Sequence, residues 1–129
     1  MRIGSAVFAV GVMLALVALP ASAEDVYVDI VNFAYIPNDV TIQVGDTVYW
    51  TNLDSVLHTV TSGTDCTSDG LFDSGDLASG DEWSYTFESA GEYPYFCLYH
   101  CETMEGIVRV EAPTPTTQTT WAQIKALYR

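Results

Sequence analysis

The chain has 129 residues, with 17 acidic and four basic side chains and a formal net charge of −13 at pH 7. A surface of this charge repels nucleic acid and anionic membranes, so both are excluded as partners. A basic partner is compatible with the charge, although acidity is also a common route to solubility.

The first 23 residues have the pattern of a secretory signal peptide. Arg2 supplies the positive start, an apolar run extends from Ala6 to Leu19, and Ala21-Ser22-Ala23 fits a small-residue cleavage site. The run is short for a spanning helix, which needs about 20 apolar residues. We therefore expect cleavage after Ala23 and export to the periplasm or another extracytoplasmic compartment, with no stable membrane insertion. An uncleaved anchor is the alternative.

Alternating apolar and polar residues predict short β-strands over residues 24–111. The expected strands are Val26–Val31, Val40–Val44, Thr47–Thr51, Val56–Ser62, Glu82–Phe87, Tyr93–Cys97 and Gly106–Glu111. Between Ser62 and Gly80 the sequence is rich in Gly, Ser, Thr and Asp, which predicts a loop or an irregular edge. Seven or eight short strands separated by turn signals predict a single all-β domain, an antiparallel β-sandwich without helices.

The sequence after residue 111 differs in composition from this domain. Residues 112–120 form a Pro/Thr linker with no core-forming side chains. Residues 121–129 have the apolar spacing of a short helix. Nine residues are too few for a stable isolated helix in water, so this segment has no assigned role.

The strongest functional signal is the segment from Tyr95 to Gly106. It holds Cys97, His100 and Met104 within eight positions, and the only other histidine of the chain is His58. A trigonal set of two histidines and one cysteine, with a long axial methionine, is the coordination of electron-transfer copper. The sequence therefore predicts a mononuclear metal site formed by these four residues.

The cysteine count is consistent with this assignment. An exported chain can form disulfides, and three cysteines leave one unpaired. If Cys97 holds a metal ion, Cys66 and Cys101 are free to pair with each other.

The residues around the site also have expected roles. His58 lies in an apolar pattern and should be buried, whereas His100 lies in a loop and should provide the route for electrons. Leu53 and Tyr35 are candidates for an apolar rim around His100, and the backbone N–H of Thr59 is a candidate donor to the Cys97 sulfur. The alternating aromatic residues fit a sandwich core better than an electron relay; they are Trp50, Trp83, Tyr85, Phe87, Tyr93 and Tyr95.

Six motifs distributed over residues 26–111 carry a family resemblance. They are Phe33-x-x-x-Pro37, Val44-Gly45-Asp46-Thr47-Val48-x-Trp50-x-Asn52, His58-Thr59-Val60, Phe72-Asp73-Ser74-Gly75, Tyr93-x-Tyr95-Phe96-Cys97-x-x-His100 and Met104-x-Gly106. Together they resemble the cupredoxins, most of all the plastocyanin and halocyanin branch. The resemblance implies a Greek-key sandwich with one type 1 blue copper ion, one-electron transfer, and ligand roles for His58, Cys97, His100 and Met104.

One feature departs from the plastocyanin pattern, because a cysteine follows directly after His100. The phytocyanins share this feature, and there the cysteine pairs with one in the preceding long loop. Cys66 occupies the matching place in this chain. The resemblance therefore implies a Cys66–Cys101 disulfide beside the copper.

Several alternatives are open at this point. A carboxylate ligand from Glu102 or Glu105 would give a red copper site with an open position and catalysis. A binuclear copper centre would need a histidine at position 105, which is Glu105. A protein that stores or delivers copper would use the same ligands. The prediction is a monomeric carrier that exchanges single electrons with a donor and an acceptor protein and is not an enzyme.

Overall fold

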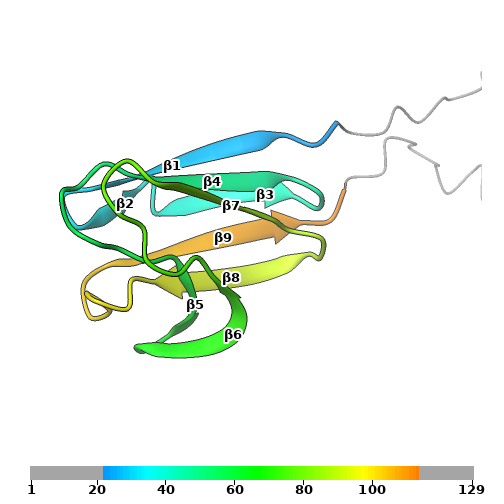
Figure 1. The fold of residues 1–129 in the computed structure, drawn as a ribbon. Helices are drawn as coiled ribbons and strands as arrows, with labels where there is room; N and C mark the ends of the chain where they lie inside the picture. The colour runs from blue at the N-terminus through cyan, green and yellow to red at the C-terminus, as the bar shows by residue number, and fades with distance from the viewer. Residues whose placement is uncertain (1–21, 114–129) are drawn as a thin grey trace, which may run out of the picture. The chain divides into compact units, whose positions relative to one another are not determined.

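In the computed structural model, which describes residues 22–113, nine β-strands form two sheets and no residue in this range is helical (Figure 1). The strands are β1 (Asp25–Val31), β2 (Ala34–Ile36), β3 (Asp39–Gln43), β4 (Thr47–Asn52), β5 (Thr61–Thr64), β6 (Thr67–Asp73), β7 (Glu82–Thr86), β8 (Gly91–Phe96) and β9 (Glu105–Glu111). The predicted all-β sandwich is confirmed, with nine strands in place of seven or eight.

The two sheets are mixed, which corrects the expectation of a purely antiparallel sandwich. One sheet has the order β2-β1-β4-β7 and the other β3-β9-β8-β5-β6. β1 pairs with β4 in parallel, and β3 pairs with β9 in parallel. Apolar alternation shows which face of a strand is buried but carries no information about the direction of its neighbour, so the sequence pattern missed both parallel pairs.

The core lies between the inward faces of the two sheets. β4 shows the alternation clearly, because Val48, Trp50 and Asn52 are buried while the residues between them are half-buried. The predicted aromatic core is confirmed: Trp50, Phe87 and Tyr95 are buried, and the other members pack against them as partly buried side chains, namely Trp83, Tyr85 and Tyr93.

The segment from Val56 to Gly80 differs from its predicted structure in two ways. His58 lies outside any strand and forms only an isolated bridge with Leu77, and β5 begins three residues later at Thr61. The expected loop contains the β5–β6 hairpin. β6 was not predicted because its sequence has no apolar alternation. It lies at the edge of its sheet and buries only Phe72.

Several sequence predictions concern the two ends of the chain. The predicted signal peptide up to Ala21, most of the Pro/Thr linker and the C-terminal segment 121–129 lie outside the described residues. Between residues 22 and 113 no helix has the length and apolar character needed to cross a membrane.

Candidate metal centre

Three of the four predicted ligand residues meet at one end of the sandwich. Cys97 directly follows β8, His100 lies in the loop from β8 to β9, and His58 comes from the connection between β4 and β5. The Cys97 Sγ atom lies 3.6 Å from Nδ1 of His58 and 3.6 Å from Nδ1 of His100. The three potential ligand atoms all lie within 4.8 Å of one another.

These distances fit a single metal ion. Bonds of about 2.3 Å to sulfur and about 2.0 Å to nitrogen, as zinc forms, place the two donor atoms about 3.5–3.7 Å apart for tetrahedral or trigonal angles. A thiolate and two imidazoles are also the donor types that copper and zinc prefer. The donor atoms therefore have the identity and the spacing that one metal ion requires.

Met104 closes the loop that carries the other two ligand candidates. Its side chain is fully buried, and it directly precedes β9. The Cys97 N–H donates to the Met104 carbonyl at 3.1 Å, and the Met104 N–H donates to the His100 carbonyl at 2.9 Å. These bonds fold the loop into a compact turn, so its three candidate side chains are held by main-chain geometry.

The two histidines differ in exposure as the sequence predicted. His58 and Cys97 are completely buried, whereas His100 is half-buried. The ring of Phe33 stands edge-on to both imidazoles, with centroids 5.5 Å from His58 and 4.9 Å from His100. His100 is therefore the imidazole that reaches the surface.

Tyr35 does not take the surface position that the sequence analysis gave it. Its side chain is only 2% exposed, and its hydroxyl donates to the Thr59 carbonyl at 2.5 Å. Desolvation by burial, with a smaller effect from Cys97, raises its pKa above the ordinary value. Phe33, 49% exposed and in the left-handed backbone region, occupies the rim in its place.

Thr59 connects the buried histidine segment to the cysteine. Its N–H donates to Cys97 Sγ at 3.4 Å, which confirms the predicted contact. Its hydroxyl accepts a hydrogen bond from the Leu98 N–H at 2.9 Å. The first bond orients the sulfur, and the second fixes the start of the β8–β9 loop.

Asp54 is a functional residue that the sequence analysis missed. Its carboxylate lies 2.8 Å from Nε2 of His58 and also accepts the N–H groups of Asn32 and Phe33 at 2.7 and 2.9 Å. Desolvation acts to raise the pKa of Asp54, but the two backbone donors and His58 outweigh it and lower the pKa. The hydrogen bond keeps the proton on Nε2, so the lone pair of Nδ1 faces Cys97.

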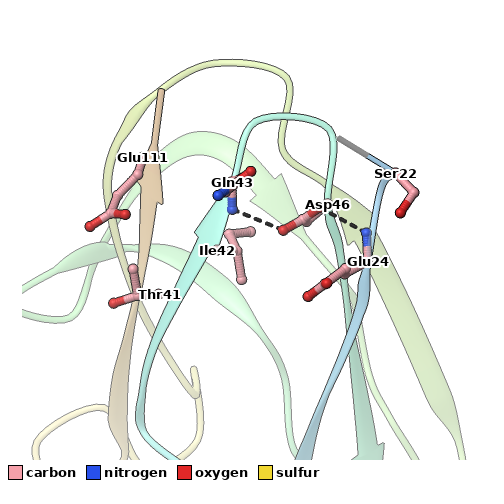
Figure 2. Close-up of a pocket in the computed structure, with 7 residues that line it drawn as sticks. All are labelled: Ser22, Glu24, Thr41, Ile42, Gln43, Asp46 and Glu111. Atoms are coloured by element: carbon pink, nitrogen blue, oxygen red, sulfur yellow. Dashed lines mark hydrogen bonds between the residues drawn. The ribbon is translucent and has the colours of Figure 1, made fainter. Parts of the chain in front are cut away.

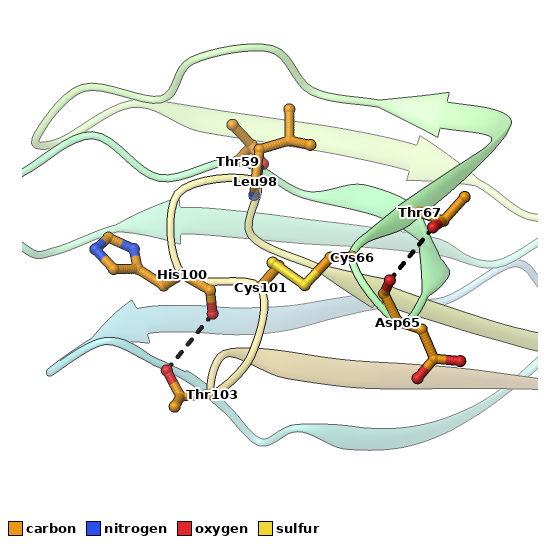
Figure 3. Close-up of a disulfide and its surroundings, with 8 residues drawn as sticks. All are labelled: Thr59, Asp65, Cys66, Thr67, Leu98, His100, Cys101 and Thr103. Atoms are coloured by element: carbon orange, nitrogen blue, oxygen red, sulfur yellow. Dashed lines mark hydrogen bonds between the residues drawn. A yellow bond between two sulfur atoms is a disulfide. The ribbon is translucent and has the colours of Figure 1, made fainter.

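The predicted disulfide is present and ties the metal loop to the β5–β6 hairpin (Figure 3). Cys66 lies in the turn between β5 and β6, and Cys101 directly follows His100. Their Cα atoms are 5.1 Å apart. The third cysteine, Cys97, is unpaired and buried. The predicted pairing of Cys66 with Cys101, which leaves Cys97 unpaired, is therefore confirmed.

Residues 23–111 match the family model described as copper binding proteins of the plastocyanin/azurin family. The match covers both segments that form the site, and it agrees with the donor set found there. The chain belongs to this family.

Curated and solved relatives of this cupredoxin agree with the assignment. It is 34% identical over 94 residues to amicyanin of Paracoccus versutus, covering 73% of this chain and 70% of the relative. It is 37% identical over 93 residues to the chloroplastic plastocyanin of Tetradesmus obliquus, covering 64% of this chain and 63% of that protein.

Among solved structures, a purple cupredoxin from Nitrosopumilus maritimus matches with a TM-score of 0.62 and 35% identity, over 67% of this chain and all of that one. A copper(I) amicyanin variant matches with a TM-score of 0.60 and 30% identity, over 67% and 82% of the two chains. The predicted cofactor and class are thus confirmed: the protein is a copper-binding cupredoxin of the electron-carrier type.

A first prediction concerns Asp54. The Asp54→Asn variant should raise the reduction potential of this cupredoxin, because the carboxylate favours the more highly charged Cu(II) through His58. A unit charge on the far side of a ligand imidazole, at the high effective dielectric of a partly exposed site, changes the potential on the order of 50 mV. Protein-film voltammetry measures the shift.

Glu102→Gln provides the matched control, since it removes an equal charge from an exposed side chain two residues after His100. It should change the potential much less. Equal shifts in the two variants would show that Asp54 acts only as one more surface charge.

Proposed function

We propose that His58, Cys97 and His100 would hold one type 1 copper ion, with Met104 as a weaker fourth ligand, and that the protein carries single electrons between two redox proteins outside the cytoplasm. The observation that carries the assignment is the position of the buried Cys97 sulfur, 3.6 Å from one nitrogen of each imidazole. Copper supplies the one-electron couple when bound. The protein holds the donor atoms in place for both oxidation states.

The burial of the site favours a carrier over an enzyme. Cys97, His58 and Met104 are fully buried, which leaves no space on their side for a substrate. Glu102 and Glu105, the carboxylates considered as alternative ligands, are both exposed. A buried thioether and exposed carboxylates support the methionine as the axial group and a closed coordination sphere. We therefore propose that the protein catalyses no reaction of its own.

The surface around His100 supports exchange with a protein partner. Several large apolar side chains are exposed on the segments that carry the ligands or Asp54 and on the β1–β2 turn that donates to Asp54. We name this set the apolar rim: Phe33, Leu53, Leu98 and Tyr99. Phe33 contacts the His100 ring directly. An apolar surface around a half-buried ligand excludes water from a transient interface. The strong negative charge of the chain suits a donor or acceptor with a basic surface, such as a basic cytochrome, that binds a cupredoxin monomer.

Copper titration of the metal-free protein tests the proposal. One equivalent of Cu(II) should produce an intense visible band that disappears on one-electron reduction and returns on oxidation. Binding of more than one ion, or turnover of a small molecule at an open position, would contradict it. Rapid loss of Cu(I) to a chelator would instead favour copper storage or delivery.

The axial role of Met104 leads to a second prediction. Met104→Gln should lower the reduction potential, because an amide oxygen is a harder donor and favours Cu(II). If the oxygen favours Cu(II) over Cu(I) by about 2 kcal/mol more than the thioether does, the one-electron potential falls by roughly 90 mV. Met104→Leu is the matched control: it removes the sulfur without adding an oxygen and should raise the potential. An unchanged value in both variants would mean that Met104 does not contact the metal.

A further inference from the structure

The end of the sandwich away from the metal loop contains a buried carboxylate that the copper site does not involve. Asp46 lies in the turn before β4, beside the start of β1 and the ends of β3 and β9. Figure 2 shows its carboxylate between two backbone nitrogens. Oδ1 accepts the Glu24 N–H at 2.8 Å, and Oδ2 accepts the Gln43 N–H at 2.9 Å.

The surroundings of Asp46 are strongly negative. The side chain is only 6% exposed, and it lines a hollow of about 420 Å³ together with Glu24 and Glu111. Arg109 is the one cationic side chain of residues 22–113, and it pairs with Asp39 and Glu92. Within this part of the chain, Asp46 therefore has backbone amides as partners but no positive charge. A buried carboxylate without a counter-charge reduces stability.

We propose that cleavage after Ala23 supplies this counter-charge, because the Glu24 nitrogen becomes an α-ammonium group that forms an ion pair with Asp46. The inference rests on the export proposed above. In the cleavage step, a signal peptidase uses water to break the Ala23–Glu24 peptide bond. The hydroxyl joins the Ala23 carbonyl carbon, and one hydrogen joins the Glu24 nitrogen. At neutral pH the new carboxylic acid releases its proton and the new amine binds one.

The local structure permits cleavage at this bond. Ser22, Ala23 and Glu24 are all exposed and precede β1. The Glu24 carbonyl accepts the Thr47 N–H at 3.0 Å, next to the first residue pair of the β1–β4 ladder. The hydrogen bonds between β1 and β4 thus begin at the Glu24 carbonyl, and the ladder does not need the residues before it.

Cleavage also strengthens a contact that already exists. The Glu24 nitrogen lies within hydrogen-bond distance of Oδ1 as a neutral amide. As an ammonium group it keeps that contact and adds a charge, and charge-assisted hydrogen bonds are roughly twice as strong as neutral ones. The carboxylates of Asp46, Glu24 and Glu111 all stabilise the ammonium form. Desolvation of this partly buried contact opposes them, although Glu24 itself is exposed.

The full-length gene, expressed in an exporting bacterial host, provides the material for the test. The intact mass of the exported protein should correspond to a chain that starts at Glu24. A pH titration followed by NMR should then give an α-amino pKa at least one unit above the ordinary value of about 8. The ion pair should contribute its whole stabilisation at pH values below the ordinary α-amino pKa. It should lose this contribution as the pH rises through the raised α-amino pKa.

Asp46→Asn in the same background should remove most of the rise in the α-amino pKa and leave only the smaller effect of Glu24 and Glu111. Glu88→Gln, which removes an exposed carboxylate just after β7, is the control and should leave most of the shift. If Asp46→Asn does not fold, the α-amino pKa of the unaltered protein still decides the question.

The possible failures are distinguishable. A mass that retains residues 1–23 would refute the proposed processing and with it the ion pair. A chain that starts at Glu24 but has an ordinary α-amino pKa would overturn the ion pair and leave export intact. A mass lower by one water would show that Glu24 has cyclised to a neutral pyroglutamate, which also contradicts the pair.

Discussion

Replacement of Cys97 with serine is expected to abolish the intense visible absorption of the oxidised copper protein. The band requires electron donation from a thiolate to Cu(II), and Cys97 is the sulfur that lies 3.6 Å from both imidazoles. A serine hydroxyl is a weak, neutral donor at pH 7. Loss of a residue that only hydrogen-bonds a metal ligand lowers metal affinity by up to about 100-fold. Loss of the ligand itself should therefore lower copper affinity by more than about 100-fold. Absorption spectroscopy and chelator competition measure the two effects.

Met104→Leu is the matched control for this experiment, because it alters another buried side chain of the same loop and leaves the thiolate in place. Its visible band should remain intense. Far-ultraviolet circular dichroism must show that Cys97→Ser is folded, since the side chain belongs to the core. An intense band that persists in folded Cys97→Ser would show that the ligand assignment is wrong.

The β8–β9 loop was predictable because its chemistry is local. Cys97, His100 and Met104 lie within eight positions, and the short loop brings them together whatever the details of the sheets. His58 is remote in sequence, but it was the only remaining histidine. The predicted disulfide followed from the cysteine next to His100 and from the resemblance to phytocyanins, and the structure confirms it.

The contacts that the sequence did not reveal depend on irregular backbone. Asn32 and Phe33 both have positive φ, which turns the Phe33 ring toward the histidines and leaves Tyr35 to point into the core. Apolar alternation assumes an extended chain, so it does not show which of these two aromatic residues reaches the surface. Asp54 looked like an ordinary turn residue. Its position four residues before His58 was the available signal, but only the fold shows that its carboxylate faces the ring.

Removal of the disulfide is expected to cause the largest loss of stability. Cys66 and Cys101 are separated by 35 positions, and closing a loop of that length stabilises the folded state by about 4 kcal/mol in the chain-entropy model. Small domains are stable by only about 5–15 kcal/mol, so the loss is a large fraction of the total. The double variant Cys66→Ser/Cys101→Ser, unfolded with guanidinium in its metal-free form, measures it.

The same variant tests whether the disulfide supports the metal site. Cys101 directly follows His100, and its bond to Cys66 anchors the β8–β9 loop to the β5–β6 hairpin (Figure 3). Without that anchor, His100 should move more freely, and a chelator should remove copper faster. Unaltered protein that is reduced in its metal-free form, and freed of the reductant before copper is added, is the control and should match the double variant. Since Cys97 stays in both forms, the visible band should persist. A double variant as stable as the unaltered protein, with unchanged copper release, would mean that hydrogen bonds within the β8–β9 loop suffice to hold the site.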